Sequence, residues 1–431
     1  MAEIKIWPGA LTGMVNVPSS KSMGHREIIC AALSKGISII DNISMSDDIK
    51  ATLRCLNALG VKTELTAGKF KGRSAVKIYG TGTVSTCGEV CDCGESGSTL
   101  RFLLPLGALC GAQVTFSGAG RLGERPLKPY WEIFDGQGIK YSPEQGLPLT
   151  VEGRLHSGKF LLPGNISSQF VSGLLFALPL LDGDSEIIIT TPLESQSYVD
   201  LTLSALGKYG IKVQNNGYKN FVVPGGQHYR SGKADVEGDW SQAAFWLVAG
   251  CLNGNIVCGG ADVNSLQGDR VVKDVLSAMG GSIKPVDGGL LAAKSRLKAA
   301  IIDAADCPDI IPVLTVAAAV AEGTTKIINA GRLRIKECDR LHAIADELNK
   351  LGADVEEQET SLVVKGRPQG LRGGRVSAWN DHRIAMSMAV ASLVCREPVL
   401  IEGSESVKKS YPGFWQDFAL LGGRYEQGES L

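Results

Sequence analysis

The chain has 431 residues, of which 44% are hydrophobic and 21% charged, and its formal net charge is −1. This length exceeds one ordinary hydrophobic core and predicts two domains, and the composition is typical of a globular protein. A net charge near zero excludes a global attraction to nucleic acid or anionic membranes. The apolar runs fall short of the roughly 18 residues that span a bilayer, and the N-terminus lacks signal architecture. We therefore expect a cytoplasmic protein with no membrane segment.

Amphipathic segments that end in glycine and lead into a short β-rich stretch recur along the chain, as in LRCLNALGVKTE and IADELNKLGADVEE. Glycine after the last helical turn is the usual left-handed C-cap, so each copy predicts a helix followed by a strand. The closing glycines are Gly60, Gly138, Gly210, Gly280, Gly352 and Gly422. Their intervals of 78, 72, 70, 72 and 70 residues indicate an internal repeat.

A second series of six segments runs in step with the first. Each opens with a polar cluster and continues as an apolar helix rich in small residues, which predicts burial of the helix. The openings are marked by Lys21, Ser98, Ser168, Ser241, Asp309 and Arg383. With β-rich stretches such as SEIIITT between the helices, the chain is predicted to have an α/β fold of α+β repeats. Six units divide into two domains of three, with the weak point in the glycine-rich segment 225–238.

Basic residues occur at two equivalent helix openings, where they oppose the helix dipole unless an anion completes the site. Lys21 and Arg26 flank the first opening, and His382 and Arg383 begin the sixth, after Asp381 as a plausible N-cap. Either pair alone could be a surface charge in water. Together they favour anion binding.

Further polar residues fit the same interpretation. Arg125 lies in a loop bounded by glycine and proline, and Lys336 and Arg340, four residues apart, are expected to share a helical face. Asp309 in the first turn of a very apolar helix is either a dipole partner or a general base. The remaining candidates, which could also be a charged loop and an N-cap, are Lys408, Lys409, Ser167, Ser168 and Gln169.

Eight motifs, in order over almost the whole chain, resemble the 5-enolpyruvylshikimate-3-phosphate synthase family. They are PSSKSMGHR, GESGSTLR, ERPL, NISSQF, SQSYVDLTL, IKECDRL, NDHRIAMS and KKSYPGF. The resemblance implies two domains, each of three βαβαββ units, with the active site in the cleft between them. We expect an N-terminal domain of residues 16–230, mainly for shikimate 3-phosphate. Residues 1–15 and 231–431 would form a C-terminal domain, mainly for phosphoenolpyruvate.

By the same resemblance, the enzyme transfers the enolpyruvyl group of phosphoenolpyruvate to the 5-hydroxyl of shikimate 3-phosphate by addition and elimination, which releases phosphate. Shikimate 3-phosphate would contact Lys21, Ser22, Arg26, Ser167, Ser168, Gln169, Ser195, Tyr198, Asp309 and Lys336. Phosphoenolpyruvate would contact Lys21, Gly97, Arg125, Gln169, Arg340, His382, Arg383 and Lys409. Lys21, Asp309 and Glu337 are expected to be catalytic, without a decision on which moves which proton. No metal or organic cofactor is needed, and we expect a monomer.

Two positions depart from the family pattern, since Glu95 stands where many members have Asn and Phe102 where many have Pro. Glu95 would repel phosphoenolpyruvate unless it is paired or turned away, so it is left out of the contact set. Gly97 permits close approach of a ligand, which leads to the hypothesis that the phosphonate glyphosate inhibits the enzyme.

The sequence disfavours three alternative interpretations. The sister transferase that acts on UDP-N-acetylglucosamine usually has a cysteine before the RP turn and a Lys-Asn pair. Here segment 120–125 has no cysteine and Ser22 follows Lys21. An RNA-phosphate-binding protein would need a basic face with aromatics, which the charge and 6% aromatic content disfavour. A metal knuckle at Cys87, Cys91 and Cys93 has no fourth ligand nearby, and eleven scattered cysteines favour reduced thiols.

Overall fold

The computed structural model describes residues 2–69 and 73–428, and these fall into two compact units. One unit combines the N-terminal segment up to Pro18 with the chain from Glu237 onward, and the other runs from Ser19 to Val236. Each is described here by itself as unit 1 and unit 2, respectively. No helix among the described residues is long and apolar enough to cross a membrane.

Unit 2 contains three sheets of the same pattern, in which one parallel pair is followed by two antiparallel pairs. The first sheet has β14 (Tyr229–Arg230), β3 (Ser34–Ile43), β5 (Ser74–Thr81) and β4 (Lys62–Ala67), with β15 (Lys233–Asp235) also on β3. The second has β6 (Cys91–Asp92), β7 (Val114–Ser117), β9 (Leu149–Glu152) and β8 (Lys140–Ser142). The third has β10 (Lys159–Leu162), β11 (Ser185–Ile189), β13 (Asn220–Val223) and β12 (Gln214–Asn215).

Unit 1 repeats this pattern in its own three sheets. The first has β2 (Leu11–Asn16), β16 (Gly254–Gly259), β18 (Gly289–Ala293) and β17 (Ser282–Val286). The second has β19 (Ile301–Asp303), β20 (Thr324–Ile328), β22 (Leu362–Lys365) and β21 (Val355–Glu357). The third has β23 (Gly374–Ser377), β24 (Val399–Glu402), β1 (Glu3–Ile6) and β25 (Tyr425–Gln427). The predicted sixfold repeat and α/β class are therefore confirmed.

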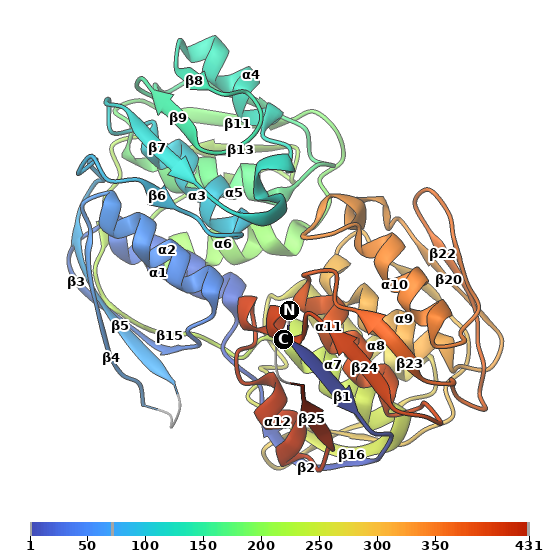
Figure 1. The fold of residues 1–431 in the computed structure, drawn as a ribbon. Helices are drawn as coiled ribbons and strands as arrows, with labels where there is room; N and C mark the ends of the chain where they lie inside the picture. The colour runs from blue at the N-terminus through green and yellow to red at the C-terminus, as the bar shows by residue number, and fades with distance from the viewer. Residues whose placement is uncertain (1, 70–72, 429–431) are drawn as a thin grey trace. The chain divides into compact units, whose positions relative to one another are not determined.

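Two helices accompany each sheet, and in both units the helices that follow the polar openings lie inward of the sheets (Figure 1). In unit 2 the helices are α1 (Lys21–Leu33), α2 (Asp47–Ala58), α3 (Gly97–Gly107), α4 (Lys128–Gln137), α5 (Ser168–Ala177) and α6 (Gln196–Lys208). In unit 1 they are α7 (Trp240–Asn253), α8 (Val272–Ala278), α9 (Ile311–Ala319), α10 (Arg340–Lys350), α11 (His382–Ser392) and α12 (Phe414–Leu420). Short 3₁₀ segments are η1 (Gly120–Glu124), η2 (Leu178–Leu180), η3 (Gly268–Val271), η4 (Pro308–Ile310), η5 (Gly331–Ile335) and η6 (Ser404–Lys409).

The residues that begin and end these helices have the predicted local chemistry. All six closing glycines have φ between 68° and 93°, the left-handed region in which a side chain is strained. At five openings a serine or aspartate side chain accepts a backbone N–H of the first turn, and these caps are Ser20, Ser96, Ser167, Asp239 and Asp381. The helices of the second series are nearly continuous runs of buried residues, because each lies in the middle of its own unit.

Candidate active site

Three cations of unit 1 converge on the carboxylate of Asp309, which lies in η4 just before the apolar helix α9. Arg340 Nη1 and Lys336 Nζ are 2.9 and 3.3 Å from Oδ1, and Arg383 Nη2 is 3.5 Å from Oδ2. Burial alone would raise the pKa of Asp309, but these cations hold it well below its usual range. Asp309 is therefore ionised at neutral pH.

The guanidinium of Arg340 is held by three carboxylates of its own unit. Its Nη2 is 2.7 Å from Glu337 Oε2, its Nε is 2.8 Å from Asp381 Oδ2, and Nη1 binds Asp309. The side chain is only 2% exposed. Against the effect of burial, these carboxylates raise the pKa of Arg340 well above its ordinary value. An incoming anion must therefore share this guanidinium with acids that already hold it.

Arg383, at the start of α11, is in the opposite situation. Its side chain is 3% exposed, and its Nε and Nη1 atoms have no hydrogen-bond partner among the described residues. The only ion pair described for it is the long one to Asp309. A buried guanidinium with unsatisfied donors is costly unless an anion completes it. Arg383 thus has two buried nitrogen donors with which it can bind a negatively charged ligand.

The backbone before α11 is fixed in an unusual conformation. Trp379 and Asn380 both have positive φ, 53° and 51°, although neither is glycine. Lys409 Nζ donates to the carbonyl oxygen of Asn380 at 2.6 Å, and Asp381 then caps the helix at the N–H of Arg383. His382 follows the cap and is buried. Such strain persists only where surrounding contacts enforce it, and it concentrates at functional sites.

The expected helical face shared by Lys336 and Arg340 is wrong. Lys336 lies just after η5 and has an extended backbone, whereas Arg340 is the first residue of α10, capped by Asp339. The two side chains nevertheless meet at Asp309. Burial lowers the pKa of Lys336, and the charge of Asp309 opposes that shift.

In unit 2 the cations of α1 are held by neighbouring helices. Lys21 Nζ is 2.7 Å from Asp48 Oδ2 of α2, with both side chains nearly buried. Arg26 donates from Nε to Thr202 Oγ1 and from Nη2 to the Tyr198 carbonyl, both at 2.8 Å on α6. Burial lowers the pKa of Arg26 to about 10. These bonds bring the start of α1 together with the first turn of α6.

Phe102, one of the two departures from the family pattern, has an aromatic ring that contacts Arg26. It is buried in α3, lies 5.2 Å from the guanidinium carbon of Arg26, and meets Phe176 edge to face at 5.4 Å between centroids. The Phe102 ring therefore stabilises the Arg26 guanidinium by a cation–π contact.

The openings of α3 and α5 are linked through Gln169. Its Oε1 accepts from Arg101 Nη1 and its Nε2 donates to Ser98 Oγ, both at 2.9 Å. Ser167 caps α5 at the N–H of Gln169, and Ser168 is the buried first residue of that helix. Ser167 is therefore the N-cap of the helix, which does not exclude ligand contact.

Arg101 also donates to the Pro126 carbonyl at 3.1 Å, which fixes the loop that carries Arg125. Gly97, the first residue of α3, lies directly against the Arg125 guanidinium, since a Cβ at position 97 would collide with Nη1. Glu95 is turned toward Gly120, where its Oε2 lies 2.5 Å from the position of a Cβ. Ser195, before α6, is buried with φ 55° and ψ 46°.

Sequence reasoning missed Asp48 and Arg101, although each holds a predicted site residue. The motif SDDIK, with Ser46 as N-cap, showed an acidic first turn but not the partner of Asp48. Arg101 stands in the quoted motif GESGSTLR, four residues after Gly97. The contact of each depends on a separate part of the chain, which spacing alone does not reveal.

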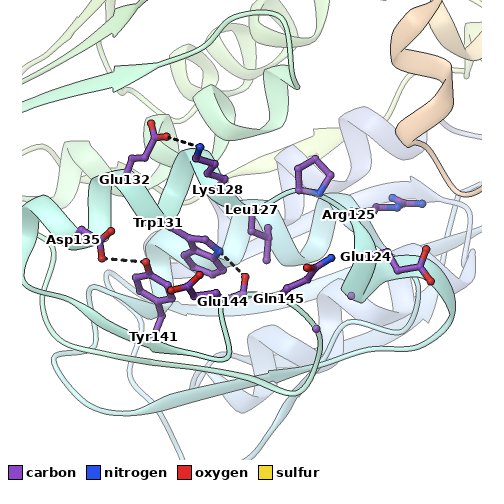
Figure 2. A pocket seen from close by; sticks show the side chains of 13 residues that line it. Glu124, Arg125, Leu127, Lys128, Trp131, Glu132, Asp135, Tyr141, Glu144 and Gln145 are labelled. Atoms are coloured by element: carbon purple, nitrogen blue, oxygen red, sulfur yellow. Dashed lines mark hydrogen bonds and ion pairs between the residues drawn. The ribbon is translucent and has the colours of Figure 1, made fainter. Parts of the chain in front are cut away.

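A hollow of about 380 Å³ in unit 2 is lined by Arg125, by residues of α4 and by segment 141–146 (Figure 2). Trp131 and Tyr141 stack there at 4.3 Å, and Trp131 Nε1 donates to the Glu144 carbonyl at 2.7 Å. Its lining has four carboxylates against two cations, namely Glu124, Glu132, Asp135 and Glu144 against Arg125 and Lys128. This charge is unsuited to a phosphorylated ligand, so the hollow is not the candidate site.

The three cysteines considered for a metal do not stay together. Cys91 and Cys93 are buried beside Cys55, with Cys55 and Cys93 Sγ atoms 3.8 Å apart, whereas Cys87 is exposed. Within residues 2–69 and 73–428, no group of three His, Cys, Asp or Glu side chains is arranged to hold a metal ion.

The fold and these sites together define a protein of two threefold-repeat units that present buried cations and carboxylates at helix openings. The family model for EPSP synthase (3-phosphoshikimate 1-carboxyvinyltransferase) matches residues 7–418. The chain belongs to this family, whose members are transferases of the shikimate pathway.

Relatives extend over the full chain. The 3-phosphoshikimate 1-carboxyvinyltransferase of Clostridium acetobutylicum is 53% identical over 422 residues, 97% of each chain. That of Clostridium novyi is 50% identical over 427 residues, 98% of each chain. Among solved structures, EPSP synthase from Acinetobacter baumannii superposes with a TM-score of 0.81 at 26% identity, and each chain is fully covered.

Proposed function

We propose that this enzyme transfers the enolpyruvyl group of phosphoenolpyruvate to the 5-hydroxyl of shikimate 3-phosphate. The single observation that supports an anionic ligand most directly is Arg383, a buried guanidinium with two unsatisfied nitrogen donors. The relatives named 3-phosphoshikimate 1-carboxyvinyltransferase supply the identity of the substrates.

The proposed division of labour follows the charges of each unit. Arg383, with His382 and Lys409 around the same helix opening, would hold phosphoenolpyruvate in unit 1, where Arg340 is already ordered by its carboxylates. Arg125 beside Gly97 would contact the same substrate from unit 2. Two phosphates and two carboxylates repel one another in water, so preorganised cations would provide much of the catalysis.

Shikimate 3-phosphate would bind mainly to unit 2, at the openings of α1, α5 and α6. These openings supply Lys21, Ser22, Arg26, Ser167, Ser168, Gln169, Ser195 and Tyr198. Hydroxyl and amide donors at helix N-termini favour a phosphate dianion. Contacts to the ring from Asp309 and Lys336 would complete the site, which requires both units to enclose the substrates. Small-angle scattering should show compaction on addition of shikimate 3-phosphate with glyphosate, and an unchanged radius would contradict closure.

The acid–base steps are assigned to groups that form ion pairs in the structure. In the addition, the 5-hydroxyl must lose a proton as its oxygen attacks C2 of phosphoenolpyruvate, and C3 must gain one. In the elimination, C3 loses a proton, the C2–O bond to phosphate breaks, and the departing phosphate takes up a proton. Asp309 is ionised and can accept a proton once anionic substrates offset its three cations. Glu337 and Lys21 are the further candidates, each close to a charged partner.

Phosphate release tests the proposal. Release is expected with phosphoenolpyruvate plus shikimate 3-phosphate, and none with UDP-N-acetylglucosamine as the acceptor. Arg383→Met should lower kcat/KM by roughly 100-fold or more, whereas Arg375→Met, on an arginine that is 61% exposed, should not. No release with the first substrate pair would overturn the proposed function.

We further propose that the enzyme acts as a monomer in the cytoplasm. Light scattering in solution should then give a mass near the 45.6 kDa of one chain, and a value twice as large would contradict this.

A further inference from the structure

The fourth helix opening, at the start of α7 in unit 1, is filled by side chains of the chain itself. Asp239 caps the helix at the N–H of Gln242, and Gln267 Oε1 accepts the N–H of Trp240 at 3.0 Å. Ser241 Oγ donates a hydrogen bond to Oδ2 of Asp269, which lies in η3. A protein carboxyl therefore lies at this opening, whereas the proposed function places substrate anions at other openings of the repeat.

Asp269 is an incompletely satisfied carboxyl. It is 2% exposed, and its Oδ1 atom has no hydrogen-bond partner among the described residues. Ionised carboxylates accept several hydrogen bonds, so a buried one with a single bond is poorly stabilised in its charged form. The site therefore favours the neutral acid more than the usual carboxylate positions of a protein do.

The same helix opening supports the cation cluster. Both η3, with Asp269, and η4, with Asp309, pack against α7, which in turn packs against α11. Gln242, which follows Ser241 in α7, donates from Nε2 to Ser410 Oγ at 3.2 Å. This bond connects α7 to the residue that follows Lys409. Asp269 is thus hydrogen-bonded to α7, the helix that packs against both η4, which carries Asp309, and α11, which carries Arg383.

We propose that Asp269 is a positioning residue whose ionisation sets the net charge felt by Arg383 and Asp309, and thereby the affinity of the enzyme for phosphoenolpyruvate. This rests on the proposed function. With a neutral Asp269, Asp309 is the nearby counter-charge of Arg383. An ionised Asp269 would add a second negative charge that acts on Arg383, which is proposed to hold the anionic substrate.

The charges that face Asp269 come from three other elements. Burial raises the pKa of Asp269 to about 7, and the charges of Asp309 in η4 and of Asp239, the N-cap of α7, also raise it. The hydrogen bond from Ser241 in α7 and the charge of Arg383 in α11 lower it. Cys307, just before η4, is also buried, and burial together with the charge of Asp269 raises its pKa. We therefore expect Asp269 to change charge near neutral pH.

The test compares the wild type with Asp269→Asn, which keeps the shape and fixes the neutral state. At each pH, the KM for phosphoenolpyruvate of the wild type is divided by that of the variant. Because the ionisation of the substrate affects both values equally, it cancels in this ratio. We expect this ratio, wild type over variant, to be near one at pH 6 and to rise roughly threefold to tenfold by pH 8.5. The KM for shikimate 3-phosphate should change much less. Asp274→Asn, at a carboxylate that is 68% exposed, is the matched control.

Ser241→Ala provides a second, independent variant. It removes the hydrogen bond that favours the ionised acid, so the pH at which KM rises should move upward rather than disappear. A ratio that stays flat between pH 6 and 8.5, or equal changes in kcat and in both KM values at every pH, would overturn the proposal.

Thermal unfolding separates this proposal from the proposed function. A carboxyl whose pKa is higher in the folded than in the unfolded protein contributes stability at a pH below its unfolded-state pKa. This stability is lost as the pH rises through its folded-state pKa. Asp269→Asn should therefore gain in Tm relative to the wild type between pH 5 and 8, whatever reaction the enzyme catalyses. The same Tm difference at both pH values would contradict the ionisation of Asp269, whereas absent phosphate release would contradict only the substrates.

Discussion

The guanidinium of Arg125 lies against the Cα atom of Gly97, in the space that a Cβ on residue 97 would occupy. The contact joins the first residue of α3 to the loop after η1, and Arg101 fixes that loop through the Pro126 carbonyl. The side chain missing from residue 97 is thus what lets the cation reach the helix N-terminus.

Gly97→Ala should displace the end of the Arg125 side chain without disrupting the fold, because a long side chain can move where backbone cannot. We expect the KM for phosphoenolpyruvate to rise about tenfold, the loss of ~1.4 kcal/mol of binding, with glyphosate inhibition weakened in parallel. Steady-state kinetics with both ligands measures this. Gly136→Ala, where a Cβ would meet nothing within 4 Å, is the matched control and should behave as the wild type. Unchanged KM in Gly97→Ala would contradict the contact, and full activity in millimolar glyphosate would refute sensitivity to that inhibitor.

Ser195 allows backbone strain to be separated from the loss of its hydroxyl. Its φ of 55° lies in the left-handed region, which costs a residue with a Cβ roughly 1 kcal/mol and glycine almost nothing. Ser195→Gly should therefore be more stable than Ser195→Ala, as measured by chemical denaturation. Both variants lack the hydroxyl and should raise the KM for shikimate 3-phosphate by similar factors. A higher KM in only one of them would place the effect in the backbone rather than in ligand contact.

The repeat could be predicted from the sequence because its signals are local. Each closing glycine adopts a left-handed backbone conformation directly after the last turn of its helix. The apolar composition of each helix of the second series predicts that the helix is buried. The openings were predictable for the same reason, since an N-cap such as Asp381 acts only two or three residues away.

The arrangement around Arg340 could not be read in this way. Its partners Asp309 and Asp381 lie 31 and 41 residues away along the chain, and they reach it through the packing of α9, α10 and α11. Spacing alone suggested that Lys336 shares a helical face with Arg340, whereas the chain between them leaves η5 in an extended conformation. Asp269 and Asp48 were missed for a related reason, because their partners come from other elements of the repeat.

Arg340→Met should strongly destabilise the folded state. The substitution leaves Asp381, which is fully buried, without its guanidinium partner and takes one cation from Asp309. Breaking a buried ion pair by removing one partner costs about 3–5 kcal/mol. Urea denaturation measures the loss, with Arg375→Met as a control at an exposed ion pair. Equal stability of the two variants would mean that water or rearrangement compensates the buried carboxylates.

Asp309→Asn tests the carboxylate at the centre of the cluster by a pH dependence as well as by rate. Because the folded pKa of Asp309 is depressed, its contribution to stability is present above its unfolded value near 3.8 and is lost as the pH falls through the folded value. The difference in unfolding free energy between wild type and variant should therefore be largest near pH 7 and shrink below pH 4. If Asp309 also transfers a proton, kcat should fall by roughly 10²- to 10⁴-fold at pH 7.

The two readouts distinguish the roles left open for Asp309. A helix-dipole partner alone predicts a loss of stability with kcat little changed, whereas a general base predicts the fall in kcat. Asp274→Asn controls for the change of a carboxylate to an amide on the surface of the same unit. A stability difference that does not vary with pH would contradict the depressed pKa, and therefore the view that Lys336, Arg340 and Arg383 act together on one carboxylate.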